Sequence, residues 1–275
     1  MVYKDLVVLL DAEPASRGRI ELAAIIAFHS GAHLVGLYAE IALELPRRLS
    51  YFDPALLVRS TGRSRPRHAG VHRKCIASPH ALSAEWRFAT GDPSQVAALH
   101  GRYADLIIAG QIDPEDKKAL SSRPRPQEVA LAVGRPVLVI PYAGRFDRVG
   151  ERVIVGWDAS RKATRAINDA LPLLTAAHSV TVVTIDPEFG PDGHGEIPGA
   201  DLALHLARHG VKATIERTVS SGIGLGDVLL SRAADLAADL LVIGAYGHSR
   251  VRELLLGGVT RSILNNMTLP VLMSH

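Results

Sequence analysis

The sequence contains several short apolar runs, and two of them occur twice in the same order. DLIIAG at residues 105–110 corresponds to DLLVIG at 239–244, and residues 134–138 correspond to 268–272, both at an offset of 134 residues. Apolar runs of this length, rich in β-branched residues and ended by glycine, are typical of strands buried on both faces of a parallel sheet. The repeat therefore predicts one α/β unit present twice in the chain.

Between these runs, further strand-like segments alternate with segments of helical period. We predict strands at 6–11, 33–38, 86–88, 105–110, 136–141, 152–158, 179–186, 212–216, 239–244 and 270–273, and helices at 19–30, 94–103, 160–176, 200–209, 227–237 and 258–266. This alternation favours parallel sheets covered on both faces, and right-handed crossovers make each one doubly wound. The prediction is two α/β domains in tandem, 1–143 and 151–275, with a polar linker between them.

Composition excludes several classes of protein. The chain is 47% hydrophobic and 21% charged, as in ordinary globular proteins. Only 5% of residues are aromatic, so stacking platforms for nucleic acid are not expected. No apolar run approaches the roughly 18 residues of a membrane span, and no signal-peptide cleavage site follows the N-terminus. We expect a cytoplasmic protein with no nucleic-acid or membrane partner.

The residues most often used in catalysis and metal binding are scattered. The single cysteine, Cys75, excludes an internal disulfide framework. His205 and His209 are four residues apart but lack the glutamate of a metalloprotease motif, and no Gly-x-Ser-x-Gly elbow occurs. We therefore assign no catalytic residue and no metal ligand. The arginine-rich segment 47–74 is interpreted as a solvated insertion, with contact to an acidic partner as the alternative.

The segment 239–273 carries the best candidate for an anion site. Gly244-x2-Gly247 follows a predicted strand, and Gly257-Gly258 precedes a predicted helix. Glycine lets a backbone approach a ligand closely, and a loop that ends at a helix N-terminus offers unpaired N–H groups to a phosphate. Ordinary tight turns are the alternative interpretation of such glycines.

The spacing Gly244-x2-Gly247-x9-Gly257-Gly258-Val259-Thr260 resembles the G-x2-G-x9-G-[ST] ATP-binding signature of the universal stress protein family. The resemblance implies a flavodoxin-like fold, ATP held by the second domain, and Mg²⁺ or Mn²⁺ on the phosphates. It places Asp158 near the ribose and the backbone of Thr184 near adenine. Gly258 stands where the family has serine or threonine, a loss for which Thr260 compensates in part. The ATP-binding residues implied are Gly156, Asp158, Thr184, Gly244, Gly247, His248, Ser249, Arg250, Gly257, Gly258, Val259 and Thr260.

The first domain lacks this loop. At the offset of 134 residues, the positions opposite Gly247, Gly257, Gly258 and Thr260 hold Asp113, Arg123, Pro124 and Pro126. Proline has no N–H to donate, and acidic side chains repel phosphate. We predict that the first domain has lost the site. Asp11, which repeats Asp158, is then expected to cap a helix, and the same helix-capping role is the alternative for Asp158.

The resemblance implies nucleotide-dependent stress signalling, with ATP as a conformational ligand. The alternatives are a slow ATPase on the same fold and a protein-interaction module with an empty loop. No general base for attack on a γ-phosphate is apparent, which favours binding without fast turnover. The two domains are expected to pair through their closing strands, 137–140 and 271–273, because an unpaired apolar edge is a liability. A homodimer is left open.

Overall fold

The computed structural model describes residues 2–11, 13, 15–41, 83–113, 115–116, 122–187, 199–245 and 258–275. Cys75, the segment 47–74 and five of the predicted site residues, Gly247, His248, Ser249, Arg250 and Gly257, lie outside these ranges.

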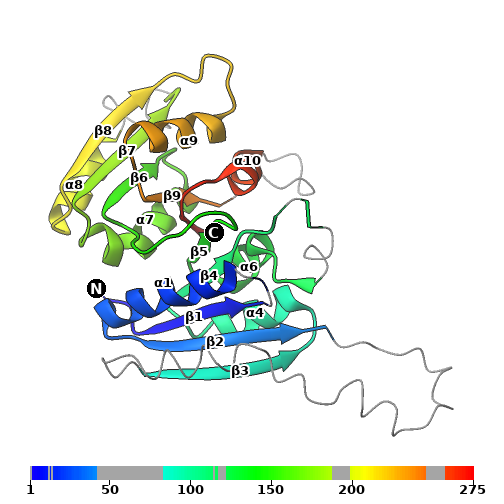
Figure 1. Cartoon of the computed structure of the whole chain (residues 1–275). Coiled ribbons are helices and arrows are strands. Elements are labelled where there is room, and N and C mark those ends of the chain that lie inside the picture. Colours follow the sequence, from blue (N-terminus) through cyan, green and yellow to red (C-terminus); the bar gives the residue numbers. More distant parts are fainter. Residues whose placement is uncertain are drawn as a thin grey trace, which may run out of the picture.

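The first unit comprises the elements from β1 to β5, and the second unit those from β6 to β10 (Figure 1). The first unit contains β1 (Asp5–Leu10), α1 (Ala15–Ser30), β2 (His33–Glu40), β3 (Ala84–Thr90), α4 (Pro93–Gly101), β4 (Leu106–Gly110), α6 (Pro126–Val133) and β5 (Val137–Ile140). The second unit contains β6 (Arg152–Gly156), α7 (Arg161–Leu174), β7 (Ser179–Ile185), α8 (Ala200–Arg208), β8 (Ala213–Thr218), α9 (Leu225–Asp235), β9 (Leu240–Gly244), α10 (Gly258–Asn266) and β10 (Val271–Ser274).

The strands form one ten-stranded sheet in the order β3-β2-β1-β4-β5-β10-β9-β6-β7-β8. Within each unit all strand pairs are parallel, and the order is third, second, first, fourth, fifth. The predicted tandem, doubly wound α/β fold is confirmed. The strand order is that of the first five strands of the dinucleotide-binding fold, and it differs from the 2-1-3-4-5 order of flavodoxin.

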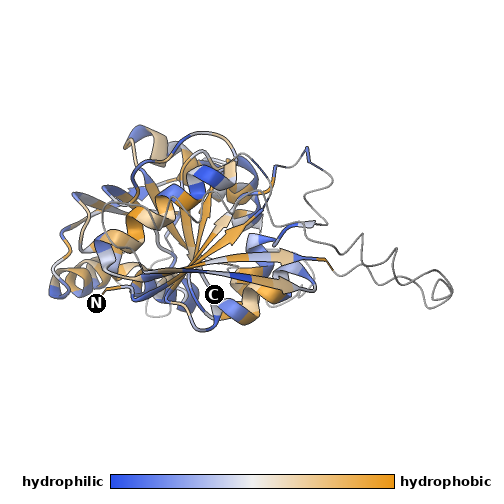
Figure 2. Ribbon diagram, turned by 60° about the horizontal axis from the view of Figure 1, so that its bottom comes forward, coloured by the Kyte–Doolittle hydropathy of each residue, from blue (hydrophilic) through white to orange (hydrophobic). Residues whose placement is uncertain are grey.

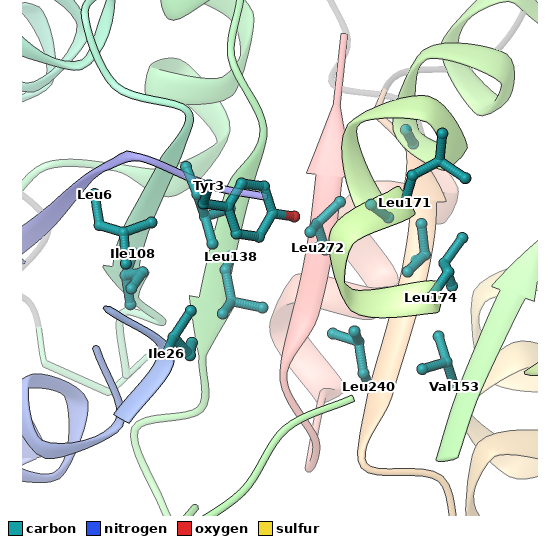
Figure 3. Packing of buried hydrophobic residues seen from close by; sticks show 14 of the residues in the cluster. Tyr3, Leu6, Ile26, Ile108, Leu138, Val153, Leu171, Leu174, Leu240 and Leu272 are labelled. Carbon is teal, nitrogen blue, oxygen red and sulfur yellow. The ribbon is translucent and has the colours of Figure 1, made fainter. Parts of the chain in front are cut away.

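The two units meet where β5 and β10 pair antiparallel, as the sequence predicted. Leu138 lies opposite Leu272, with Val139 opposite Val271 and Val137 opposite Met273. Leu138 and Leu272 are themselves equivalent in the repeat, so a pseudo-twofold axis passes through this residue pair. Figure 3 shows the two leucines on neighbouring strands of the joint. Each unit thereby removes the unpaired edge of the other.

A separate hydrophobic core lies on each face of the sheet. Side chains alternate along each strand, so Leu106 and Ile108 enter one core while Ile107 and Ala109 enter the other. α1, α7 and α8 supply the first core, and α4, α6, α9 and α10 supply the second. Figure 2 shows the apolar strands at the centre with the helices around them. Because both cores contain residues of both units, the hydrophobic interior is continuous across the joint.

Tyr3 links the two units through a buried hydrogen bond. Its hydroxyl donates to the carbonyl oxygen of Asp169 in α7 at 2.9 Å, and Figure 3 shows that hydroxyl pointing toward the second unit. Burial raises the pKa of Tyr3 above its ordinary value, so the side chain remains a neutral donor. A more exposed link runs from the guanidinium of Arg165 to the carbonyl oxygen of Gly134, at 3.2 Å.

Two helices differ from the sequence prediction. α1 begins at Ala15, four residues earlier than expected, and α6 was not predicted at all. Pro126 occupies the first turn of α6, where the missing N–H costs nothing, and Gly134 ends the helix in a left-handed conformation. Within the described ranges, no helix is long and apolar enough to cross a membrane.

Candidate functional site

The strand order reverses once in each unit, between β1 and β4 and between β6 and β9. In open α/β sheets, ligands bind outside the carboxyl ends of the strands at such a reversal. In the second unit Gly156 ends β6 and Gly244 ends β9, while Thr184 lies one residue before the end of β7. The structure therefore places these three predicted site residues at one edge of the sheet.

The two glycines at this edge lie where an added side chain would press on neighbouring atoms. A Cβ on Gly244 would lie 2.5 Å from the backbone nitrogen of Ala163, because the start of α7 packs directly on the end of β9. A Cβ on Gly156 would lie 3.2 Å from Leu229 and 3.3 Å from Ile243. Glycine at these two positions therefore has a structural cause that does not depend on a ligand.

Asp158 lies on the protein surface just beyond β6. Its Oδ1 accepts a hydrogen bond from the backbone N–H of Ser160 at 3.0 Å. The N-cap of α7 is Ser160, whose Oγ accepts from the N–H of Ala163 at 3.2 Å. The helix-capping alternative for Asp158 is therefore wrong, and its carboxylate stays exposed beside the strand end.

Lys162 lies in the first turn of α7, close to Asp158. Burial lowers the pKa of Lys162, and the neighbouring carboxylate of Asp158 opposes that shift. A Cβ placed on Gly244 would lie 3.0 Å from the Cβ of Lys162, so this lysine belongs to the same edge of the sheet. No sequence motif covers the first turn of α7, so Lys162 was not predicted as a site residue.

The side chain of Thr184 is fully buried, and its hydroxyl donates to the carbonyl oxygen of Glu216 at 3.4 Å. The side chain of Thr184 therefore does not face a ligand, and the backbone contact with adenine that the resemblance implies stays a prediction.

At the start of α10, Gly258 and Val259 are exposed, whereas Thr260 is only 2% exposed. Among the described residues, apart from the adjoining residues and the helix's own backbone, no heavy atom lies within 4 Å of a Cβ placed on Gly258. The described part of the structure therefore leaves the start of the helix unobstructed, and the first N–H groups of a helix lack intrahelical partners. Thr260 faces the protein interior, so it does not share the exposed surface of Gly258 and Val259.

In the first unit, a guanidinium fills the corresponding strand reversal. Arg19 of α1 is 4% exposed and donates from Nε to the carbonyl oxygen of Leu9 at 2.9 Å. Its Nη2 contacts Asp11 Oδ2 at 2.8 Å and Ser16 Oγ at 3.2 Å. A Cβ on Gly110 would lie 2.1 Å from its Nη1, so the guanidinium also lies against the end of β4.

The expected capping role of Asp11 is wrong, because its carboxylate pairs with Arg19 and accepts the N–H of Glu13 at 3.0 Å. A sequence signal for Arg19 was present. It is a charged residue on the apolar face of a helix, eight residues after an aspartate. Charged side chains on such a face are rarely buried unless they are paired.

A second arginine crosslinks the same edge of the first unit. Arg123, which stands opposite Gly257 in the repeat, contacts Glu13 at 2.6 Å and Asp116 at 3.2 Å. Pro126 begins α6, so the helix that corresponds to α10 starts with a residue that has no N–H. The acids and arginines at this edge are thus engaged with one another.

The fold defines a tandem, doubly wound α/β protein. Its candidate nucleotide site lies at the carboxyl ends of the strands of the second unit. The family model described as "Universal stress protein family" matches residues 150–275. Universal stress protein Slr1230 from Synechocystis sp. is 27% identical over 173 residues, which cover 61% of this chain and 57% of that protein. The chain therefore matches little more than half the length of that relative.

Solved structures match over nearly the whole chain. A universal stress protein from Archaeoglobus fulgidus has a TM-score of 0.73 at 16% identity, covering 98% of this chain and 95% of that one. A functionally unknown protein from Pseudomonas aeruginosa has a TM-score of 0.58 at 16% identity, covering 99% and 92%. At this identity the structural likeness shows the fold alone. The second unit, residues 150–275, matches the universal stress protein family, and the chain as a whole has the tandem fold of these solved structures.

Proposed function

We propose that the second unit binds ATP at the carboxyl ends of β6, β7 and β9, and that this binding serves nucleotide-dependent stress signalling in the cytoplasm. The observation that carries the proposal is the contrast between the two strand reversals. Arg19 fills the first, whereas in the second Asp158 is exposed and no other described segment obstructs the start of α10 at Gly258. Only the second unit also has the family's glycine spacing.

Four of the described site residues are assigned roles in the proposed complex. The Asp158 carboxylate accepts hydrogen bonds from ribose hydroxyls, and the backbone of Thr184 contacts adenine. The N–H groups of Gly258 and Val259 donate to phosphate oxygens, favoured by the positive end of the helix dipole. Within the described residues, no group of three or more His, Cys, Asp or Glu side chains could hold a metal ion. Mg²⁺ or Mn²⁺ therefore enters the proposal as a ligand of the phosphates.

The proposal includes slow hydrolysis at most. The sequence lacks the lysine of a P-loop, and it shows no obvious general base for attack of a water molecule on the γ-phosphate. We expect turnover far below the ordinary enzyme rate of about 10 per second. A preparation that hydrolyses ATP at that rate, and loses the activity together with ATP binding, would establish the enzyme alternative.

The test has two stages. Purified protein is first denatured, and any released nucleotide is identified by chromatography. ATP affinity of nucleotide-free protein is then measured by calorimetry for wild type, Asp158→Asn and Asp147→Asn. Asparagine at 158 retains an oxygen for the N–H of Ser160 but loses the charge that accepts ribose hydroxyls, so ATP affinity should fall about tenfold. Asp147 lies in the linker and pairs with Arg145, so the same loss of charge at this position should leave the ATP affinity unchanged.

Wild-type protein that releases no nucleotide and shows no ATP binding in calorimetry would refute the proposal. Equal affinities of the two variants would remove Asp158 from the site.

A further inference from the structure

The two ends of α10 face different units. Its N-terminus, at Gly258, belongs to the candidate site of the second unit, whereas its last turn contacts the first unit. The last four carbonyl groups of a helix have no intrahelical partner. α10 has no basic side chain in its last turn and no acidic one in its first. Its placement therefore depends on partners outside the helix.

Gln111 of the first unit supplies that partner. It follows β4 and is 4% exposed. Its Nε2 donates to the carbonyl oxygen of Leu264 at 2.7 Å and points toward that of Asn265 at 3.4 Å. Its Oε1 accepts the N–H of Tyr142 at 3.2 Å. A buried amide donor thus satisfies the negative end of α10 from across the joint.

The repeat shows that pairing of the units does not itself require this contact. The position equivalent to Gln111 is Ala245, at the end of β9. The backbone N–H of Ala245 donates to the carbonyl oxygen of Ser274 at 2.7 Å. In the same way, the backbone N–H of Gln111 donates to the carbonyl oxygen of Ile140 at 2.8 Å. Alanine, however, has no side-chain donor. The side-chain bond therefore runs in one direction only, from the first unit to the helix of the second.

We propose that Gln111 is a positioning residue for nucleotide binding by the second unit. The inference rests on the proposed function. α10 has nine residues and is about 13 Å long, so a shift at its last turn moves its first turn as well. A further side-chain anchor of α10 is Ser262, whose hydroxyl donates to Asp227 of α9 at 2.7 Å. By holding the last turn, Gln111 fixes the direction of the N–H groups at Gly258 and Val259.

The test compares ATP with adenosine in the full-length protein. Gln111→Leu keeps a similar volume but removes both amide groups. Gln111→Glu keeps the acceptor for Tyr142 but has no amide donor, and its charge faces the negative end of the helix. Because α10 meets only the phosphates, each variant should raise the calorimetric dissociation constant for ATP by about threefold to tenfold and leave that for adenosine unchanged. Amide hydrogen exchange of α10 should be faster in the ligand-free variants.

Tyr3→Phe is the matched control. It removes another side-chain hydrogen bond from the first unit to a helix carbonyl of the second, that of Asp169 in α7, and it does not touch α10. Both dissociation constants should stay at the wild-type values. The proposal is overturned if folded Gln111 variants bind ATP as wild type does, if adenosine binding weakens equally, or if Tyr3→Phe has the same effect. Wild-type protein that binds neither ligand refutes the proposed function, and the inference with it.

Discussion

Replacing Arg19 by methionine should destabilise the first unit strongly, because it leaves a carboxylate almost buried without its charged partner. The side chains of Arg19 and Asp11 are 5% and 14% exposed, and their closest atoms are 2.8 Å apart. Removing one member of a buried ion pair typically costs 3–5 kcal/mol. Asp11 keeps the N–H of Glu13, so we expect about 3 kcal/mol for Arg19→Met.

The matched control lies on the same helix. Arg17 and Glu21 form an ion pair at 2.9 Å, but their side chains are 65% and 48% exposed. Exposed pairs of this kind contribute about 0.3–0.5 kcal/mol. Arg17→Met should therefore change the free energy of unfolding by less than about 0.5 kcal/mol. The two arginines differ in burial and partners, and so the comparison isolates the effect of the buried site.

Urea unfolding, followed by circular dichroism and by the fluorescence of Trp86 and Trp157, measures both effects. These tryptophans lie in different units, so coincident transitions also test whether the chain unfolds as one cooperative structure. The double variant Asp11→Ala, Arg19→Met should lose less stability than the two single variants added together, because it leaves no unpaired charge. If Arg19→Met costs no more than Arg17→Met, the guanidinium does not support the first unit and our reasoning about its strand reversal is wrong.

Three further predictions concern the second unit. Gly258→Ser restores the family's hydroxyl at a position that no other described segment obstructs, so it should strengthen ATP binding about tenfold in calorimetry. Gly258→Asp should raise the melting temperature, because a negative charge favours the helix N-terminus, but it should weaken ATP binding, because the same charge repels phosphate. Gly244→Ala should lower the free energy of unfolding by more than about 2 kcal/mol, since its Cβ would lie 2.5 Å from backbone, and Gly258→Ala should not; equal urea midpoints would contradict this contrast. The fragment 151–275 should dimerise through β10 or aggregate, and a stable monomer in sedimentation at micromolar concentration would show that the first unit has another purpose.

The repeated apolar runs made most of the fold predictable from the sequence. Nearly every strand and five of the seven helices of the described chain were expected close to their observed positions, because burial on both faces imposes a recognisable local pattern. The pairing of β5 with β10 also followed from the sequence, since each unit ends in an apolar strand that needs a partner. α6 was missed because Pro126 indicates a loop unless its place in the first turn of a helix is known.

The candidate site was only partly predictable. The glycine spacing and the strand ends at Gly156 and Gly244 can be identified from local sequence, and the structure places Gly156 and Gly244 at one edge of the sheet. The reason for those two glycines is tertiary, because the atoms that exclude a Cβ belong to α7, to Leu229 and to Ile243. Asp158 and Asp11 occupy equivalent positions, yet one is exposed and the other is paired with Arg19.

The sequence by itself determined the α/β class, the tandem repeat and the unit that carries the glycine loop. These properties depend on hydrophobic period and on backbone freedom, which act over a few neighbouring residues. Only the tertiary structure decided which polar groups are buried and with what partners. Arg19 meets the end of β4 and Gln111 meets the last turn of α10 across separations of about 90 and 150 residues. A buried polar group must find its partner in space, and chain order does not specify which distant carbonyl or carboxylate that partner is.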